Sequence, residues 1–121
     1  MVLALFLTLA TLTACSNRPS IVGPLRPGQF DCGDYRFTES RLGDGSQCIL
    51  DKMTAGVPAR LVVRAHTTEG DPILDMYEVT GPRALDWWHD ARADKFGSRR
   101  VEHHTCSAAD INSGRLYPIG C

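Results

Sequence analysis

One stretch decides the fold: Ala59-Arg60-Leu61-Val62-Val63-Arg64-Ala65-His66-Thr67. Its apolar, largely β-branched centre, Leu61 to Val63, is typical of a strand. The next segment, Thr68-Glu69-Gly70-Asp71-Pro72, has the composition of a turn, and Ile73 to Thr80 then predicts a second strand. We therefore expect these two strands to pair antiparallel.

The chain after this pair predicts more strands. Gly81-Pro82 indicates a turn, Arg83 to His89 a third strand, and Arg99 to Thr105 a fourth strand. Asp90 to Ser98 is expected to connect the last two. The tail from Ser107 to Cys121 shows little pattern, and we expect it to be loose without a disulfide.

The residues before the deciding stretch predict one strand and one helix. Tyr35 to Thr38 alternates and favours a strand, and Gly43-Asp44-Gly45-Ser46 reads as a turn with Asp44 or Ser46 as a possible helix cap. Gln47 to Ala55 then predicts a short helix with one apolar stripe. The expected fold is α+β, with one short helix packed on an antiparallel β-meander in the order β-α-β-β-β, stapled by disulfides.

Composition limits the class of protein. The chain has 121 residues, of which 43% are hydrophobic and 22% charged, as in ordinary globular proteins. Thirteen basic residues against 14 acidic ones give a net charge of −1. A near-neutral chain lacks the broad basic surface that nucleic-acid binding requires, so we expect no nucleic-acid partner.

The first residues predict export and lipid attachment. Val2 to Thr13 is an apolar run of signal-peptide length, too short to span a bilayer. It ends in Leu12-Thr13-Ala14-Cys15, which resembles the lipobox of bacterial lipoprotein precursors. The resemblance implies cleavage before Cys15, a diacylglyceryl group on its thiol, and further acylation such as palmitate on its amine. No Lys or Arg precedes the run, which departs from the usual signal and leaves the translation start open.

Three segments follow from this resemblance. Residues 1–14 would be the signal peptide, residues 15–29 the lipidated cysteine and a flexible, Pro- and Gly-containing tether, and residues 30–121 a single small domain. The protein would then be held at the cell membrane by lipid on Cys15 and face the extracytoplasmic side.

The other four cysteines predict two disulfides, because exported small domains are commonly cross-linked. Of the three possible connectivities we favour Cys32–Cys48 and Cys106–Cys121, since both close short loops. The crossed pairings stay open at this point.

Trp87 and Trp88 suggest a binding surface. Neighbouring strand residues point to opposite faces, and Asp86 shares a face with Trp88. Because an unpaired carboxylate is hard to bury, we expect that face to be wet, with Trp87 in the core and Trp88 as a possible contact for a partner.

A metal site is a weaker alternative. His89, Glu102 and His104 would share one face of two neighbouring strands, and imidazole and carboxylate groups are zinc and copper ligands. The sequence contains no nucleophile motif and no phosphate-binding Gly-rich loop, so we expect neither an enzyme nor a cofactor.

The expected function is therefore a surface-tethered, non-catalytic interaction or accessory domain. Its partner would be an unknown protein, peptide or envelope component; the alternative is a ligand- or metal-binding envelope lipoprotein using the His89, Glu102 and His104 face. The chain from about Cys32 to Cys106 also resembles small lipoproteins of GC-rich bacteria. That likeness rests on Thr68 to Ile73 with Tyr77 and on Asp94 to Ser98, and it implies no particular activity.

Overall fold

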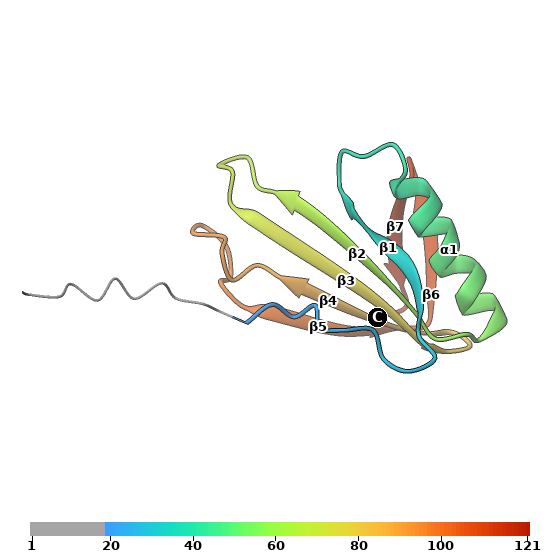
Figure 1. The fold of residues 1–121 in the computed structure, drawn as a ribbon. Coiled ribbons are helices and arrows are strands. Elements are labelled where there is room, and N and C mark those ends of the chain that lie inside the picture. Colours follow the sequence, from blue (N-terminus) through green and yellow to red (C-terminus); the bar gives the residue numbers. More distant parts are fainter. Residues whose placement is uncertain (1–18) are drawn as a thin grey trace, which may run out of the picture.

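The structure is a computed structural model that describes residues 19–121. These residues form one α-helix, a five-stranded sheet and a two-stranded hairpin (Figure 1). The elements of the sheet and the helix are, in chain order, β1 (Phe30–Arg36), α1 (Leu42–Ala55), β2 (Ala59–His66), β3 (Pro72–Gly81), β4 (Ala84–Asp90) and β5 (Val101–Cys106). The hairpin consists of β6 (Ala108–Asn112) and β7 (Arg115–Ile119). The expected signal peptide and Cys15 lie outside the described residues.

The strand order in the sheet is β1-β2-β3-β4-β5. β2 to β5 form the predicted antiparallel meander, with Leu61 opposite Tyr77 and Tyr77 opposite Trp87. β1, however, pairs parallel with β2. The expectation of a wholly antiparallel sheet is wrong at this edge, because a helix between two neighbouring strands returns the chain to the end where it started. The fold remains α+β.

The helix begins at Leu42, five residues before the predicted start at Gln47. The predicted turn over residues 43–46 is therefore wrong, and neither Asp44 nor Ser46 caps the helix with its side chain. Gly45 is buried, and a Cβ there would lie 2.6 Å from the Tyr35 ring, so glycine is needed for close packing rather than for a turn. The helix ends as expected at Gly56, which adopts the left-handed conformation.

The core lies between α1 and one face of the sheet, which we call the helix face. Ile49 of the helix packs with Leu61, Val79 and Leu85, and all four are fully or almost fully buried. Ser46, also buried, donates a hydrogen bond of 2.8 Å to the carbonyl oxygen of Gly114 in the hairpin turn. The helix thus joins the sheet and the C-terminal hairpin into one core.

The expectation of a loose tail is wrong, because residues 108–119 form the β6–β7 hairpin. Ser113 and Gly114 both have positive φ angles, as a tight two-residue hairpin turn requires. Leu116 is buried in the core, so apolar packing against α1 orders the tail in addition to any disulfide.

Both favoured disulfides are present. Cys32 of β1 is bonded to Cys48 of α1, and Cys106 at the end of β5 is bonded to Cys121. The first bond joins a strand to the helix above it. The second holds the chain terminus beside the sheet.

Residues 19–29 cross the sheet face opposite the helix (Figure 1). Gln29 donates a 2.8 Å hydrogen bond to Glu78, Arg26 lies 3.3 Å from the same carboxylate, and Arg60 donates to the carbonyl oxygen of Gly23. This part of the expected tether has no regular secondary structure, as expected, but it is held against the sheet. On this covered face Met76, for example, is buried.

Residues 19–121 contain no helix that is long and apolar enough to cross a membrane.

Candidate functional site

The helix face is covered only in part. α1 and the hairpin gather over one portion of the sheet, and the strands extend beyond them (Figure 1). The register places Asp75, His89 and Glu102 in one row across β3, β4 and β5, with Trp87 and His104 in the neighbouring row. We call these five residues the Asp75 cluster. They are all half-buried.

Asp75 organises this cluster. Its Oδ1 atom accepts a 2.8 Å hydrogen bond from Nε1 of Trp87 and lies 2.7 Å from Nδ1 of His89. The side chains of His89 and Asp75 are 29% and 20% exposed, so the pair is partly shielded from water. This hydrogen bond raises the pKa of His89 above its ordinary value. The cluster therefore holds a proton more firmly than a solvated histidine does.

Aromatic stacking fixes the Trp87 ring. Its centroid lies 6.3 Å from the Tyr77 ring, with the two planes 17° apart, and 5.0 Å from the His104 ring. Burial raises the pKa of Tyr77, so its phenol stays protonated at neutral pH and offers no base. The rings of Tyr77 and His104 thus flank Trp87, and its hydrogen bond to Asp75 also fixes its position.

A groove of about 290 Å³ opens between this cluster and the hairpin. Its aromatic lining includes Phe37, Tyr77, Trp87 and Tyr117, and Asp75 is among its polar groups. Phe37 and Tyr117 are 37% and 46% exposed, and the guanidinium of Arg115 lies 3.7 Å from the Phe37 ring centre. Amphipathic aromatics with a few polar groups around a hollow are typical of binding sites.

The three residues of the metal alternative do share a face, as the sequence analysis expects. Yet Nδ1 of His89 faces Asp75, and Nε2 of His104 lies 3.7 Å from Glu102. In the described residues, no three His, Cys, Asp or Glu side chains are grouped as a metal site requires. The carboxylate that contacts His89 is that of Asp75. Asp75 belongs to no sequence motif, so the sequence did not predict it as part of the site.

Within the cluster, Asp75 and His89 form a hydrogen-bonded carboxylate–imidazole pair that holds a proton. Within residues 19–121, the hydrogen bond to Asp75 is the only side-chain hydrogen bond of the His89 ring. A histidine held by a carboxylate can exchange a proton with any group of a bound partner that lies within hydrogen-bond reach. The arrangement supplies charge, hydrogen-bond donors and aromatic faces to a bound partner.

The two tryptophans occupy opposite faces. Trp87 lies on the helix face and Trp88 on the other, which is the predicted arrangement. The expectation that the second face is wet is wrong over β2 and β3, where residues 19–29 cross it, whereas His103 and Thr105 of β5 are exposed on the same face. Trp88 is half-buried, its ring centroid lies 3.8 Å from that of His103, and its buried Nε1 has no hydrogen-bond partner among residues 19–121. A role of Trp88 in binding stays a prediction.

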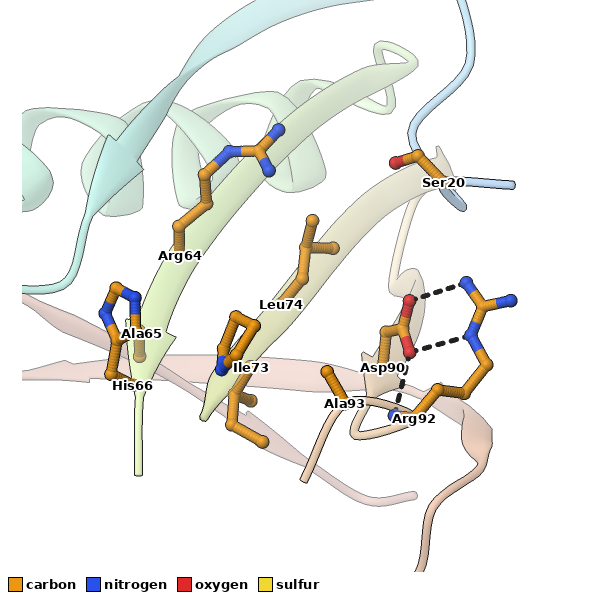
Figure 2. A pocket seen from close by; sticks show the side chains of 10 residues that line it. Ser20, Arg64, Ala65, His66, Ile73, Leu74, Asp90, Arg92 and Ala93 are labelled. Atoms are coloured by element: carbon orange, nitrogen blue, oxygen red, sulfur yellow. Dashed lines mark hydrogen bonds and ion pairs between the residues drawn. The ribbon is translucent and has the colours of Figure 1, made fainter. Parts of the chain in front are cut away.

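A second hollow, of about 320 Å³, lies at the end of the sheet where β2 ends and β3 begins. Figure 2 shows that the Arg92 guanidinium donates two hydrogen bonds to the Asp90 carboxylate, one of 2.9 Å from Nε to Oδ1 and one of 2.7 Å from a terminal nitrogen to Oδ2. This contact lowers the pKa of Asp90. Arg64, which also lines the hollow, is paired with Asp34. Since these charges already pair within the chain, we do not assign a ligand here.

Comparisons of the chain with protein-family models, with curated proteins and with solved structures found no significant match.

Proposed function

We propose that the chain is an exported lipoprotein, anchored through Cys15, whose domain binds a protein or peptide partner without catalysis. The observation that carries the binding part is the groove beside the Asp75 cluster. Its rim presents Phe37 and Tyr117 to solvent, and Trp87 forms part of its wall. Large aromatic side chains around a hollow supply contact area at little cost in side-chain entropy.

The lipobox supports the anchoring part. Lipid on Cys15 would concentrate the domain at a membrane surface, where even a modest affinity for a neighbouring envelope component is effective. The two disulfides agree with an exported protein, because such bonds persist in oxidising compartments.

The anchor is tested by expressing the full chain and the Cys15→Ala variant in a bacterium with lipoprotein processing. The native chain should incorporate labelled palmitate and enter the detergent phase on phase separation. The variant should do neither. A native chain that remains unlabelled in the aqueous phase contradicts the anchor.

The groove is tested by cross-linking in the same cells, followed by purification of the tagged chain. Tyr117→Ala should lose a specific cross-linked partner, whereas Phe30→Ala should retain it. The control is matched, because Phe30 is 48% exposed and Tyr117 46% exposed, but Phe30 lies outside the groove. Equal cross-linking by both variants excludes the groove as the binding site.

A further inference from the structure

The connection between β4 and β5 carries an unusually exposed apolar side chain. Phe96 is 78% exposed, more than any other large hydrophobic residue in the described part of the chain. Asp94 accepts a 3.1 Å hydrogen bond from the backbone N–H of Phe96, which helps to shape the loop. A phenylalanine held out at the tip of an ordered loop has no packing role within the domain.

Basic residues surround this side chain. Residues 91–100 hold four of them, against the single carboxylate of Asp94: Arg92, Lys95, Arg99 and Arg100. The guanidinium of Arg92 is hydrogen-bonded to Asp90, whereas Lys95, Arg99 and Arg100 are exposed to solvent. The side chains of Lys95 and Arg100 are 74% and 71% exposed.

The neighbouring carboxylates neutralise these cations only in part. Nζ of Lys95 lies 3.9 Å from Asp71, and Arg100 lies 3.3 Å from Glu102. Arg99 donates to the backbone carbonyl of Lys95 rather than to a carboxylate. The exposed charges around Phe96 are therefore mainly those of Lys95, Arg99 and Arg100, since the side chains of Asp71 and Glu102 are only 11% and 34% exposed, and we call these three cations the basic patch.

The loop lies at the end of the domain where the described chain begins. Arg92 donates a 2.8 Å hydrogen bond to the carbonyl oxygen of Pro19. Figure 1 shows the loop, in orange, and the start of the described chain, in blue, at the same end of the sheet. Cys15 precedes Pro19 by four residues. Four residues span at most about 14 Å, so lipid on Cys15 would lie close to this end.

We propose that the loop of residues 91–100 docks on the bilayer that holds the anchor. Phe96 enters the boundary between headgroups and acyl chains, and Lys95, Arg99 and Arg100 contact anionic phospholipid headgroups. This inference rests on the proposed anchoring at Cys15. An apolar side chain among cations suits such a surface, since the ring leaves water while the charges remain among phosphates. Docking would set the orientation of the domain on the membrane.

The test places a tryptophan at the tip. The full lipidated chain with Phe96→Trp is reconstituted in vesicles of phosphatidylethanolamine and phosphatidylglycerol that contain brominated phospholipid, which quenches tryptophan at the bilayer. Phe30→Trp is the control, because Phe30 pairs with Ala59 at the opposite end of the sheet. Trp87 and Trp88 give the same background in both. Phe96→Trp should lose fluorescence beyond this background, and Phe30→Trp should not.

A charge variant tests the basic patch. Adding Lys95→Gln and Arg99→Gln to Phe96→Trp should reduce the quenching, as should high salt. Equal quenching of Phe96→Trp and Phe30→Trp, while both chains float with the vesicles, overturns the docking and leaves the anchor intact. A chain that does not float with the vesicles overturns the anchor, and with it the docking that rests on it.

Discussion

Nε1 of Trp87 donates a hydrogen bond of 2.8 Å to Oδ1 of Asp75 across the β3–β4 pair. Trp87→Phe should keep most of the ring packing and lose this bond, which lowers the free energy of unfolding by about 1 kcal/mol. Trp87→Ala also removes the stacking on Tyr77 and should cost about 3 kcal/mol. Urea unfolding measures both. Equal losses for the two variants would show that the hydrogen bond, and not the ring, provides the stability.

Stability should depend on pH through His89. Its pKa is raised in the folded state, mainly by the hydrogen bond to Asp75, so its stabilising contribution is complete below the unfolded pKa of about 6.5. The contribution is lost as pH rises through the folded pKa. His89→Gln should therefore be less stable than the native protein in mildly acidic solution, and the gap should narrow at alkaline pH. A gap that widens with rising pH contradicts this assignment.

The two helix glycines should respond oppositely to alanine. A Cβ at Gly45 would lie 2.6 Å from the Tyr35 ring and 2.7 Å from Leu61, so Gly45→Ala should lower the melting temperature. At Gly43 a Cβ would lie 3.6 Å from Gly114, an ordinary contact. Gly43→Ala should be neutral or stabilise the protein by up to about 1 kcal/mol through helix propensity. Two equal losses would argue against the close approach at Gly45.

The Cys32–Cys48 bond should contribute to stability by joining β1 to α1. Replacing both cysteines by serine should cost about 3 kcal/mol, the expectation for a loop of this length. Alkylation without reductant, followed by mass spectrometry of the native protein, should find no free thiol at Cys32, Cys48, Cys106 or Cys121. Free thiols at any of these four positions in the exported chain would contradict the oxidised state.

Removing the partners of Glu78 should loosen residues 19–29 from the sheet. Glu78 is 4% exposed and is contacted by Arg26 and Gln29. Gln29→Ala leaves this buried carboxylate with fewer hydrogen bonds and should cost about 1–3 kcal/mol. Hydrogen exchange should then rise at Val22 and nearby amides. Unchanged exchange would mean that the remaining contacts, such as the hydrogen bond from Arg60 to the carbonyl oxygen of Gly23, hold the segment without Gln29.

Local chemistry in the sequence determined the central meander. The β-branched residues around Val62, the turn residues 68–72 and the alternation along residues 83–89 act within a few positions, so they could be interpreted without a structure. The favoured disulfides followed in the same way from short loops. The sharing of one face by His89, Glu102 and His104 needed only strand register.

Only tertiary structure decided the rest, because each remaining feature depends on residues far apart in the chain. Residues 43–46 have turn composition but are helical, since Tyr35 and Leu61 pack directly against Gly45. Trp88 is half-buried, and its ring stacks on that of His103 from the neighbouring strand. Asp75 joins His89 only once β3 and β4 pair. For residues other than proline, helix propensities differ by about 1 kcal/mol or less per residue, and burial of a core side chain outweighs them.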